Sequence, residues 1–180
     1  MTVTLPSLTL VLGGAASGKS DYAERLVLST GQLLAYIATA QAFDDEMGAK
    51  IERHQARRGG NWRTIEAPLE IGPALTEIRA DEVVLLDCAT MWLSNQMGAD
   101  LALAEAEAGL FASLTSCKAP VVIVSNEVGT GIVPENALAR RFRQAQGELN
   151  QRLAQRADLV ITVMAGLPLT LKGTLPAGAP

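Results

Sequence analysis

Short apolar runs alternate with helix-like segments along the chain, and this alternation limits the fold more than any other feature of the sequence. Each run has the length of a strand and is bounded by polar or turn-forming residues. The runs are Leu8–Leu12, Leu33–Ala38, Val83–Asp87, Val121–Ser125 and Leu159–Met164. Uninterrupted apolar runs are typical of strands buried on both faces. The sequence therefore predicts an α/β fold in which helices cover a mainly parallel sheet.

The segments between these runs predict helices. They are Ser20–Thr30, Asp44–Arg58, Ala102–Leu114 and Glu135–Arg156, and Trp62–Ala67 is a weaker strand candidate. The second helix opens with acidic residues and closes with arginines, a charge order that complements the helix dipole. No repeat or linker interrupts the pattern, so we expect one domain over residues 1–180, with a frayed tail at 174–180.

Composition narrows the classes of partner. The net charge is −4 and the sequence has no basic tract, so nucleic acid is not an expected partner. The N-terminus lacks the features of a signal peptide, and no apolar run is long enough to span a membrane. Cys88 and Cys117 form neither a metal-ligand spacing nor a disulfide framework. We therefore expect reduced thiols and a cytoplasmic protein.

Residues 13–20 read GGAASGKS and fit the phosphate-loop pattern G-x-x-x-x-G-K-[ST]. They follow a predicted strand and open a predicted helix, which is the context that this motif requires. Gly13 and Gly18 let the backbone curl so that its N–H groups can face a phosphate chain. Lys19 is expected to reach the β- and γ-phosphates, and Ser20 to ligate Mg²⁺.

Asp87 is the second candidate residue for this chemistry. It ends a buried strand, where an acidic residue can hold Mg²⁺ directly or through water. A strand that ends in aspartate is weak support by itself, and the neighbouring phosphate loop strengthens it. The sequence has no N-K-x-D guanine motif, so it is not that of an ordinary switch GTPase.

A polar loop at residues 125–136 follows another buried strand. Loops at the carboxyl ends of parallel strands face the ligand crevice, so Asn126, Glu127 and Gly129 are candidates for a substrate loop. A plain turn is the alternative. Pro134 is expected in the first turn of the next helix.

The helix after this loop carries three arginines. Arg140, Arg141 and Arg143 could clamp a phosphate group. A solvated helix face is the more common reason for such a group of charges. Spacing alone favours the solvated face.

His54 is the only histidine in the chain. Met47, Ile51 and His54 fall along one face of the predicted helix, so the histidine lies at the margin of an apolar stripe. Arg53 and Arg57 should disfavour a further positive charge and keep the imidazole neutral. A neutral imidazole is a competent nucleophile toward phosphorus, although spacing alone favours a structural histidine.

Four stretches together resemble a known family. They read LVLGGAASGKSDYAE, YIATAQAFDDEMGAKIERHQARRGGNWRTIEAP, VVLLDCATMWLSN and VVIVSNEVGTGIVPENALARRFRQAQGELNQRLAQRAD. The chain is similar to the bifunctional adenosylcobinamide kinases/adenosylcobinamide-phosphate guanylyltransferases of cobalamin biosynthesis. The likeness runs from about residue 8 to 166, and other phosphate-loop proteins lack this combination of motifs.

The resemblance implies two reactions. An NTP phosphorylates the hydroxyl of adenosylcobinamide, and GMP then passes from GTP through a guanylylated histidine to adenosylcobinamide phosphate. It implies that His54 is this histidine, that GTP and ATP are substrates, and that the fold is a RecA-like P-loop domain assembled as a homotrimer. The implied nucleotide-binding residues are Gly13, Gly14, Ala15, Ala16, Ser17, Gly18, Lys19, Ser20, Glu66 and Asp87.

The sequence departs from the family at one position and offers alternatives for two assignments. Ala16 stands where the family loop usually has arginine, so one phosphate or intersubunit contact is in doubt. Asp87 and Glu127 are both candidates for the base of the kinase step. A simple small-molecule kinase with a structural His54 is the main alternative, and a nucleotide-binding regulator without transfer chemistry is another.

Overall fold

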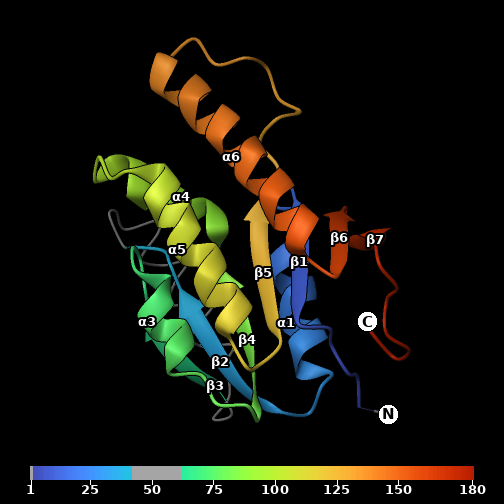
Figure 1. The fold of residues 1–180 in the computed structure, drawn as a ribbon. Coiled ribbons are helices and arrows are strands. Elements are labelled where there is room, and N and C mark those ends of the chain that lie inside the picture. The colour runs from blue at the N-terminus through green and yellow to red at the C-terminus, as the bar shows by residue number, and fades with distance from the viewer. Residues whose placement is uncertain (1, 42–61) are drawn as a thin grey trace.

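The protein forms a seven-stranded sheet with helices on both faces (Figure 1). The structure is a computed structural model and describes residues 2–41 and 62–180. Strand order is β3-β2-β4-β5-β1-β6-β7. The strands are β1 (Leu8–Gly13), β2 (Leu33–Ala38), β3 (Trp62–Glu66), β4 (Glu82–Asp87), β5 (Val121–Asn126), β6 (Leu159–Met164) and β7 (Leu167–Lys172). The helices are α1 (Lys19–Leu28), α3 (Ile71–Thr76), α4 (Ala89–Gly98), α5 (Leu103–Ser116) and α6 (Ala137–Arg156).

The predicted fold class, an α/β fold with a mostly parallel sheet, is confirmed. Every pairing from β3 to β6 is parallel, and only β7 runs antiparallel to its neighbour. All five strongly apolar runs form strands, and the weaker candidate forms β3. One strand, β5, separates the phosphate-loop strand β1 from the acid-bearing strand β4.

Two apolar layers cover the sheet. On one face, Tyr22, Leu26 and Val27 of α1 pack against Val11 and Val124 of the strands. On the other face, apolar side chains of α3, α4, α5 and α6 pack together over the opposite sides of the same strands. Because strand side chains alternate between faces, the face of any strand residue follows from its neighbours.

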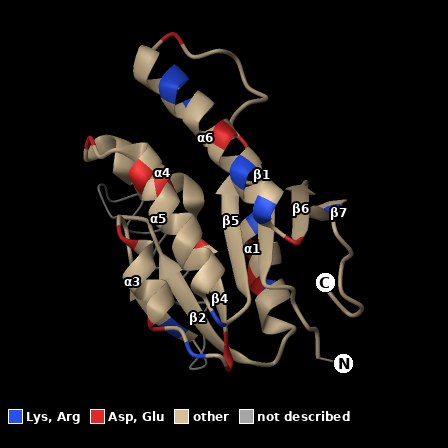
Figure 2. Cartoon of the chain, in the orientation of Figure 1, with Lys and Arg blue, Asp and Glu red and all other residues tan. Residues whose placement is uncertain are grey.

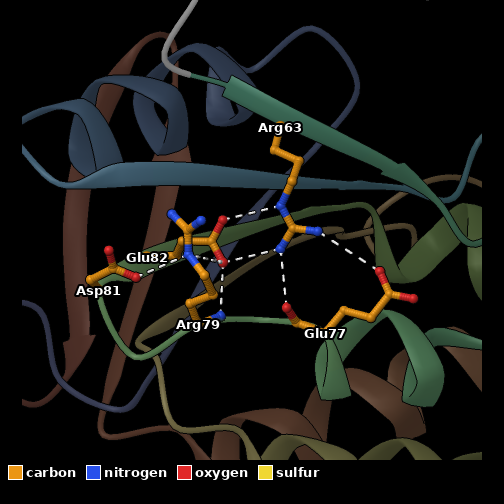
Figure 3. A network of polar contacts seen from close by, with 5 residues as sticks. All are labelled: Arg63, Glu77, Arg79, Asp81 and Glu82. Atoms are coloured by element: carbon orange, nitrogen blue, oxygen red, sulfur yellow. Dashed lines mark hydrogen bonds and ion pairs between the residues drawn. The ribbon is translucent and has the colours of Figure 1, made fainter.

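An ion-pair network fixes β3 at the edge of the sheet (Figure 3). Arg63 of β3 reaches across β2 to Glu82 of β4, and its Nε and Nη2 donate to the two carboxylate oxygens at 3.1 and 3.0 Å. The Glu82 side chain is only 2% exposed. Burial raises the pKa of Glu82, but hydrogen bonds from Arg63 and from the Arg79 backbone outweigh it and hold the pKa below its usual value. The ionised pair thus joins β3 to β4.

Some expected boundaries are wrong. Helix α6 begins at Ala137 rather than Glu135, because the Asn136 side chain caps it by accepting from the backbone N–H groups of Leu138 and Ala139. Pro134 therefore lies in the loop and not in the first turn of the helix. The expected helix Asp44–Arg58 lies outside the described residues.

The C-terminal residues 174–180, expected to be frayed, are partly packed. Leu175 and Ala179 lie against the α1-side layer, near Val3 and Leu5 of the N-terminal segment. Burial of these apolar side chains holds the tail against the body of the protein.

Candidate active site

The phosphate loop joins β1 to α1 at the carboxyl edge of the sheet. Gly18 is the N-cap of α1, and its carbonyl accepts the first helical hydrogen bond, from Tyr22 N–H at 2.9 Å. Lys19 Nζ donates to the Gly14 carbonyl at 3.1 Å, across the loop. Ala15 and Ala16 are exposed, and Ala16 adopts a left-handed conformation with φ 54°. The loop therefore presents its own backbone at a helix N-terminus, which favours an anion.

The turn between β6 and β7 supports the phosphate loop from behind. Gly166 N–H donates to the Ser17 carbonyl at 2.8 Å. A Cβ atom on Gly18 would lie 3.2 Å from Gly166 Cα, and Gly18 also has a φ of 88°. Gly18 is therefore required both by its backbone conformation and by the close approach of this turn. The sequence prediction did not identify Gly166, although the Ala165-Gly166 pair before an alternating Leu-x-Leu-x-Leu run is a hairpin signal.

Three polar residues end the strands β3, β4 and β5 at the same edge of the sheet. Asp87 ends β4 and Glu66 ends β3, and both pair in register with Ala38 of β2. Asn126 ends β5 in register with Gly13. By alternation along their strands, all three side chains lie on the α1 face, since Trp62, Leu85 and Val124 of the same strands pack into the α1-side layer. The structure thus places Asn126 on the strand next to the phosphate-loop strand, Asp87 on the second strand away and Glu66 two strands further out.

The surroundings of Asp87 show a half-buried carboxylate. Tyr36 donates its hydroxyl proton to Asp87 Oδ2 at 3.3 Å. Burial, with the nearby Asp87 charge as a second cause, raises the pKa of the adjacent Cys88 thiol to about 11. The thiol is therefore protonated near neutral pH, and it caps α4 by accepting from Met91 N–H. Cys88 and Cys117 are both free.

A buried amide ties the ends of β2 and β3 to α4. Asn95 Nδ2 donates to the Thr39 carbonyl at 2.8 Å and to the Pro68 carbonyl at 2.9 Å. Thr39 Oγ1 in turn exchanges hydrogen bonds with the backbone of Cys88. These contacts fix where β2 ends beside Asp87. The sequence prediction missed Asn95 because its partners are distant in the chain.

The loop after β5 is held by its own carboxylate. Glu127 accepts hydrogen bonds from Gly129 N–H and from both the backbone and the hydroxyl of Thr130. Burial raises the pKa of Glu127, but the bonds from Thr130 and Gly129 outweigh it and hold the pKa below its usual value. A carboxylate engaged in this way is a poor proton acceptor, so the geometry disfavours Glu127 as the base.

Two of the α6 arginines also hold this loop. Arg140 donates to the carbonyls of Pro134 and Glu135, and Arg143 donates to the Gly129 carbonyl. Arg141 is exposed. Figure 2 shows basic segments spaced along α6 and separated by neutral and acidic ones. The sequence offered a phosphate clamp or a solvated helix face for these arginines. Neither describes Arg140 and Arg143 fully, since both hold the loop by hydrogen bonds.

His54 lies outside the described residues, and so do Arg53 and Arg57. Among residues 2–41 and 62–180, no cluster of three or more histidine, cysteine, aspartate or glutamate side chains could hold a metal ion by itself. The helices of this part of the chain include none with the length and apolar character needed to cross a membrane.

Comparisons with known proteins cover nearly the whole chain. A sequence model of the family described as cobinamide kinase / cobinamide phosphate guanyltransferase matches residues 9–171. The bifunctional adenosylcobalamin biosynthesis protein CobP of Pseudomonas aeruginosa is 44% identical over 167 residues, which cover 91% of this chain and 96% of that protein. The bifunctional adenosylcobalamin biosynthesis protein CobU of Salmonella typhimurium is 42% identical, over 92% of this chain and 99% of that protein. Among solved structures, the RadB recombinase aligns with a TM-score of 0.44 and 17% identity, over 88% of this chain and 74% of that one.

Proposed function

Because the chain belongs to the cobinamide kinase / cobinamide phosphate guanyltransferase family, we propose that it catalyses both reactions of that name. It first phosphorylates the hydroxyl of adenosylcobinamide with an NTP. It then transfers GMP from GTP to adenosylcobinamide phosphate, which gives adenosylcobinamide-GDP and pyrophosphate. The observation that carries this proposal is the match over nearly the full length of the relatives, together with a phosphate loop flanked by polar strand ends.

In the kinase step, the substrate hydroxyl oxygen attacks the γ-phosphorus of the NTP. The new O–P bond forms as the bond between the γ-phosphorus and the β,γ-bridging oxygen breaks, and NDP leaves. Residues 13–20 hold the phosphates through backbone N–H groups at the start of α1, and Lys19 offsets the charge that develops on the leaving group. The geometry disfavours Glu127 as the base that receives the hydroxyl proton, since Glu127 is committed to its own loop.

In the guanylyltransferase step, we assign His54 as the nucleophile. An imidazole nitrogen attacks the α-phosphorus of GTP, an N–P bond forms, and pyrophosphate leaves. A phosphate oxygen of adenosylcobinamide phosphate then attacks the same phosphorus and releases the histidine. The covalent intermediate divides one displacement into two easier ones. The assignment is supported by the place of His54 in the sequence, in the segment that follows β2, whose last residue Ala38 pairs in register with Asp87.

Mg²⁺ fits the donor set at this edge. Magnesium is usually held by one or two carboxylates together with substrate phosphates, so a site without a cluster of three acidic ligands is the ordinary case. The Asp87 carboxylate and the Ser20 hydroxyl at the start of α1 are the residues that would hold it. When bound with the nucleotide, the ion supplies charge neutralisation at the phosphates.

The remaining nucleotide and substrate contacts follow from the same edge. Glu66 and the residues of the phosphate loop, including Ala15 and Ala16, line the nucleotide, which is GTP or ATP. Asn126, Glu127 and Gly129 form the loop that faces the cobinamide substrate. Hydrogen bonds made by Glu127 and Arg143 hold this loop in one conformation, which supports a substrate-binding surface that is already formed.

We further propose that the whole chain acts as one domain in the cytoplasm. A single sheet includes strands from Leu8 to Lys172, which supports one domain. Two free cysteines, one of them buried, suit a reducing compartment.

We propose the homotrimer that the family resemblance implies, and two exposed apolar patches support a contact between copies of the chain. The loop patch consists of Ile132, Val133 and Leu138, and the hairpin patch of Met164, Leu167, Leu169 and Leu171. Figure 1 shows the two at separate places on the molecule, since β7 lies at the sheet edge and the loop lies beside the N-terminal end of α6. Two different patches suit a head-to-tail contact, which closes into a ring when the rotation allows it.

Protein labelling tests the function directly. We expect α-labelled GTP and magnesium to leave an acid-labile, base-stable label on the protein, and γ-labelled NTP to transfer its label to adenosylcobinamide. The His54→Ala variant should fold, phosphorylate adenosylcobinamide and take up no α-label. Undiminished α-label in that variant would contradict the assignment of His54. Transfer of γ-label without any α-label on the wild-type protein would instead favour a simple small-molecule kinase.

A further inference from the structure

Asn126 occupies the strand end between the two main phosphate-binding features of the site. Figure 1 shows β5 between β1 and β4. Asn126 pairs in register with Gly13, the first residue of the phosphate loop, and Glu127 N–H donates to the Gly13 carbonyl at 3.0 Å. On the other side, β5 pairs with β4, which ends in Asp87. Asn126 therefore lies between the loop that holds phosphates and the acid proposed to hold their metal.

The backbone of Asn126 is held from two directions. Its N–H donates to Thr90 Oγ1 at 2.8 Å, and its carbonyl accepts from Asn150 Nδ2 at 2.9 Å. Thr90 belongs to α4 and Asn150 to α6, so residues from two helices form hydrogen bonds with the backbone of Asn126. Both of its backbone groups are thus satisfied without its own side chain.

A buried polar network stands behind these two contacts. Ser125 Oγ donates to Asn150 Oδ1 at 2.6 Å, and Gln146 Nε2 donates to Ser125 Oγ at 3.0 Å and to Asn150 Oδ1 at 2.9 Å. Ser125 and Gln146 are fully buried. A connected network of buried polar side chains fixes a single arrangement, because breaking any bond leaves an unsatisfied polar group. The backbone of Asn126 is therefore held in place before any ligand binds.

The side chain of Asn126 takes no part in the hydrogen bonds that hold its backbone. In the part of the chain that the structure describes, its carboxamide makes no hydrogen bond, and the residue is half-buried rather than exposed. Ser125 faces α6, so alternation turns Asn126 to the opposite face, where α1 begins and Asp87 also lies. An unpaired amide at a fixed position beside a phosphate site can donate to a phosphoryl oxygen.

We propose that Asn126 is a catalytic residue whose carboxamide N–H donates to an oxygen of the γ-phosphoryl group of the bound NTP. This inference rests on the proposed function and concerns its kinase step. As the bond from the γ-phosphorus to the bridging oxygen breaks and the bond to the substrate oxygen forms, the equatorial oxygens carry the charge that this donor stabilises. The amide exchanges no proton, so the hydroxyl proton still passes to a separate base. A donor carried on a backbone that is already fixed needs little reorganisation during the reaction.

The γ-phosphoryl contact makes a specific prediction for nucleotide affinity. We expect Asn126→Ala and Asn126→Asp to bind GDP as the wild type does but to bind GTP less tightly, in equilibrium titrations with magnesium. Their kinase kcat should fall about 10²-fold, as is typical when one such donor is removed. At saturating GTP, α-label should still reach His54 within about tenfold of the wild-type rate, because that step breaks the bond at the α-phosphorus.

Two further variants distinguish the contact of Asn126 with the nucleotide from general effects of substitution on the fold. Gln144→Ala removes an exposed amide on α6 that donates only to Glu148, and it should match the wild type in every assay. Asn150→Leu removes the support for Asn126 and should lower kinase kcat while leaving GDP affinity unchanged. Thermal unfolding verifies that each variant is folded. Asn126→Asp keeps the shape of the side chain, so the test remains decisive if Asn126→Ala does not fold.

Results that contradict the role of Asn126 differ from results that contradict the proposed function. Equal losses of GTP and GDP affinity in a folded Asn126 variant, or a kinase kcat within twofold of the wild type, would overturn the role of Asn126. A wild-type protein that transfers neither label would instead refute the proposed function itself.

Discussion

At the residue scale, the phosphate loop depends on contacts made by residues far away in the chain. Gly18 lies against Gly166 of the β6–β7 turn, and Ser17 accepts a hydrogen bond from the same glycine. Ala165 and Gly166 both have positive φ values, of 53° and 78°, as a tight two-residue hairpin turn requires. The loop is therefore shaped from behind as well as by its own glycines.

We expect Gly18→Ala to weaken nucleotide binding while the protein remains folded. The substitution places a Cβ atom against Gly166 and forces alanine into a left-handed conformation, which costs about 1–2 kcal/mol, or roughly tenfold in affinity or more. Titration with GTP and with GDP should show similar losses, because the whole loop moves. Gly98→Ala, at the end of α4 with open space around its Cβ, is the matched control and should bind normally. Unchanged nucleotide affinity in Gly18→Ala would refute the role of this contact.

The sequence predicted the candidate residues that directly follow strands and missed those that act across the fold. Lys19, Asp87 and Asn126 were found because each belongs to a loop or strand end with a local signal. Asn95 and Thr90 carry no such signal, since each contacts a carbonyl or N–H group that is more than thirty residues away in the chain. Their importance follows only from the pairing of strands that brings those groups together.

At the element scale, the pattern of burial explains why the sequence did not predict helices α3 and α4. Helix α4 buries residues on several sides, including Trp92, Leu93, Asn95 and Gln96, so it lacks the one-sided apolar stripe that predicts a helix. Helix α3 is short and contains glycine and proline. The strands were easier to predict, because parallel strands buried on both faces read as plain apolar runs.

The Arg63–Glu82 clamp makes a prediction about stability. Arg63→Met keeps the apolar stem but leaves the buried Glu82 carboxylate without its main partner, which should reduce the free energy of unfolding by about 2 kcal/mol. This figure lies below that for a fully buried pair because the Arg63 side chain is 40% exposed. Arg79→Met is the matched control: its side chain is 59% exposed and lies 4.0 Å from Glu82, so the loss should be small.

The same comparison should depend on pH. The pKa of Glu82 is lowered in the folded protein, so its contribution is present above the unfolded value of about 4.3 and is lost as the pH falls through the folded pKa. Denaturant unfolding of the wild type and of Arg63→Met should therefore differ at neutral pH and converge in acid. A difference that stays constant across this range would show that the charge of Glu82 does not stabilise the fold.

At the scale of the whole molecule, the interior strands of the sheet are buried, whereas the edge strand β7 and the loop before α6 expose apolar side chains to solvent. The interior strands are covered by apolar layers on both faces, yet every residue of β7 is exposed. Edge strands with exposed apolar side chains tend to pair or associate unless something covers them. The hairpin patch carries Leu169 at 63% exposure, and the loop patch carries Ile132 at 97%. Both margins therefore suit contact with another copy of the chain.

A charge within the hairpin patch should test this assembly. We expect Leu169→Glu to convert the proposed trimer into monomers in sedimentation experiments, because burying an unpaired carboxylate in an apolar contact is strongly unfavourable. Each monomer should keep its fold, since Leu169 contributes nothing to the buried layers of the sheet. Leu101→Glu adds the same charge at a similarly exposed leucine outside both patches and should leave the trimer intact. If Leu169→Glu sediments as the wild type does, the hairpin patch is not part of the contact. A wild-type protein that sediments as a monomer would contradict the trimer itself, because the heterologous contact between the two patches could then not have formed.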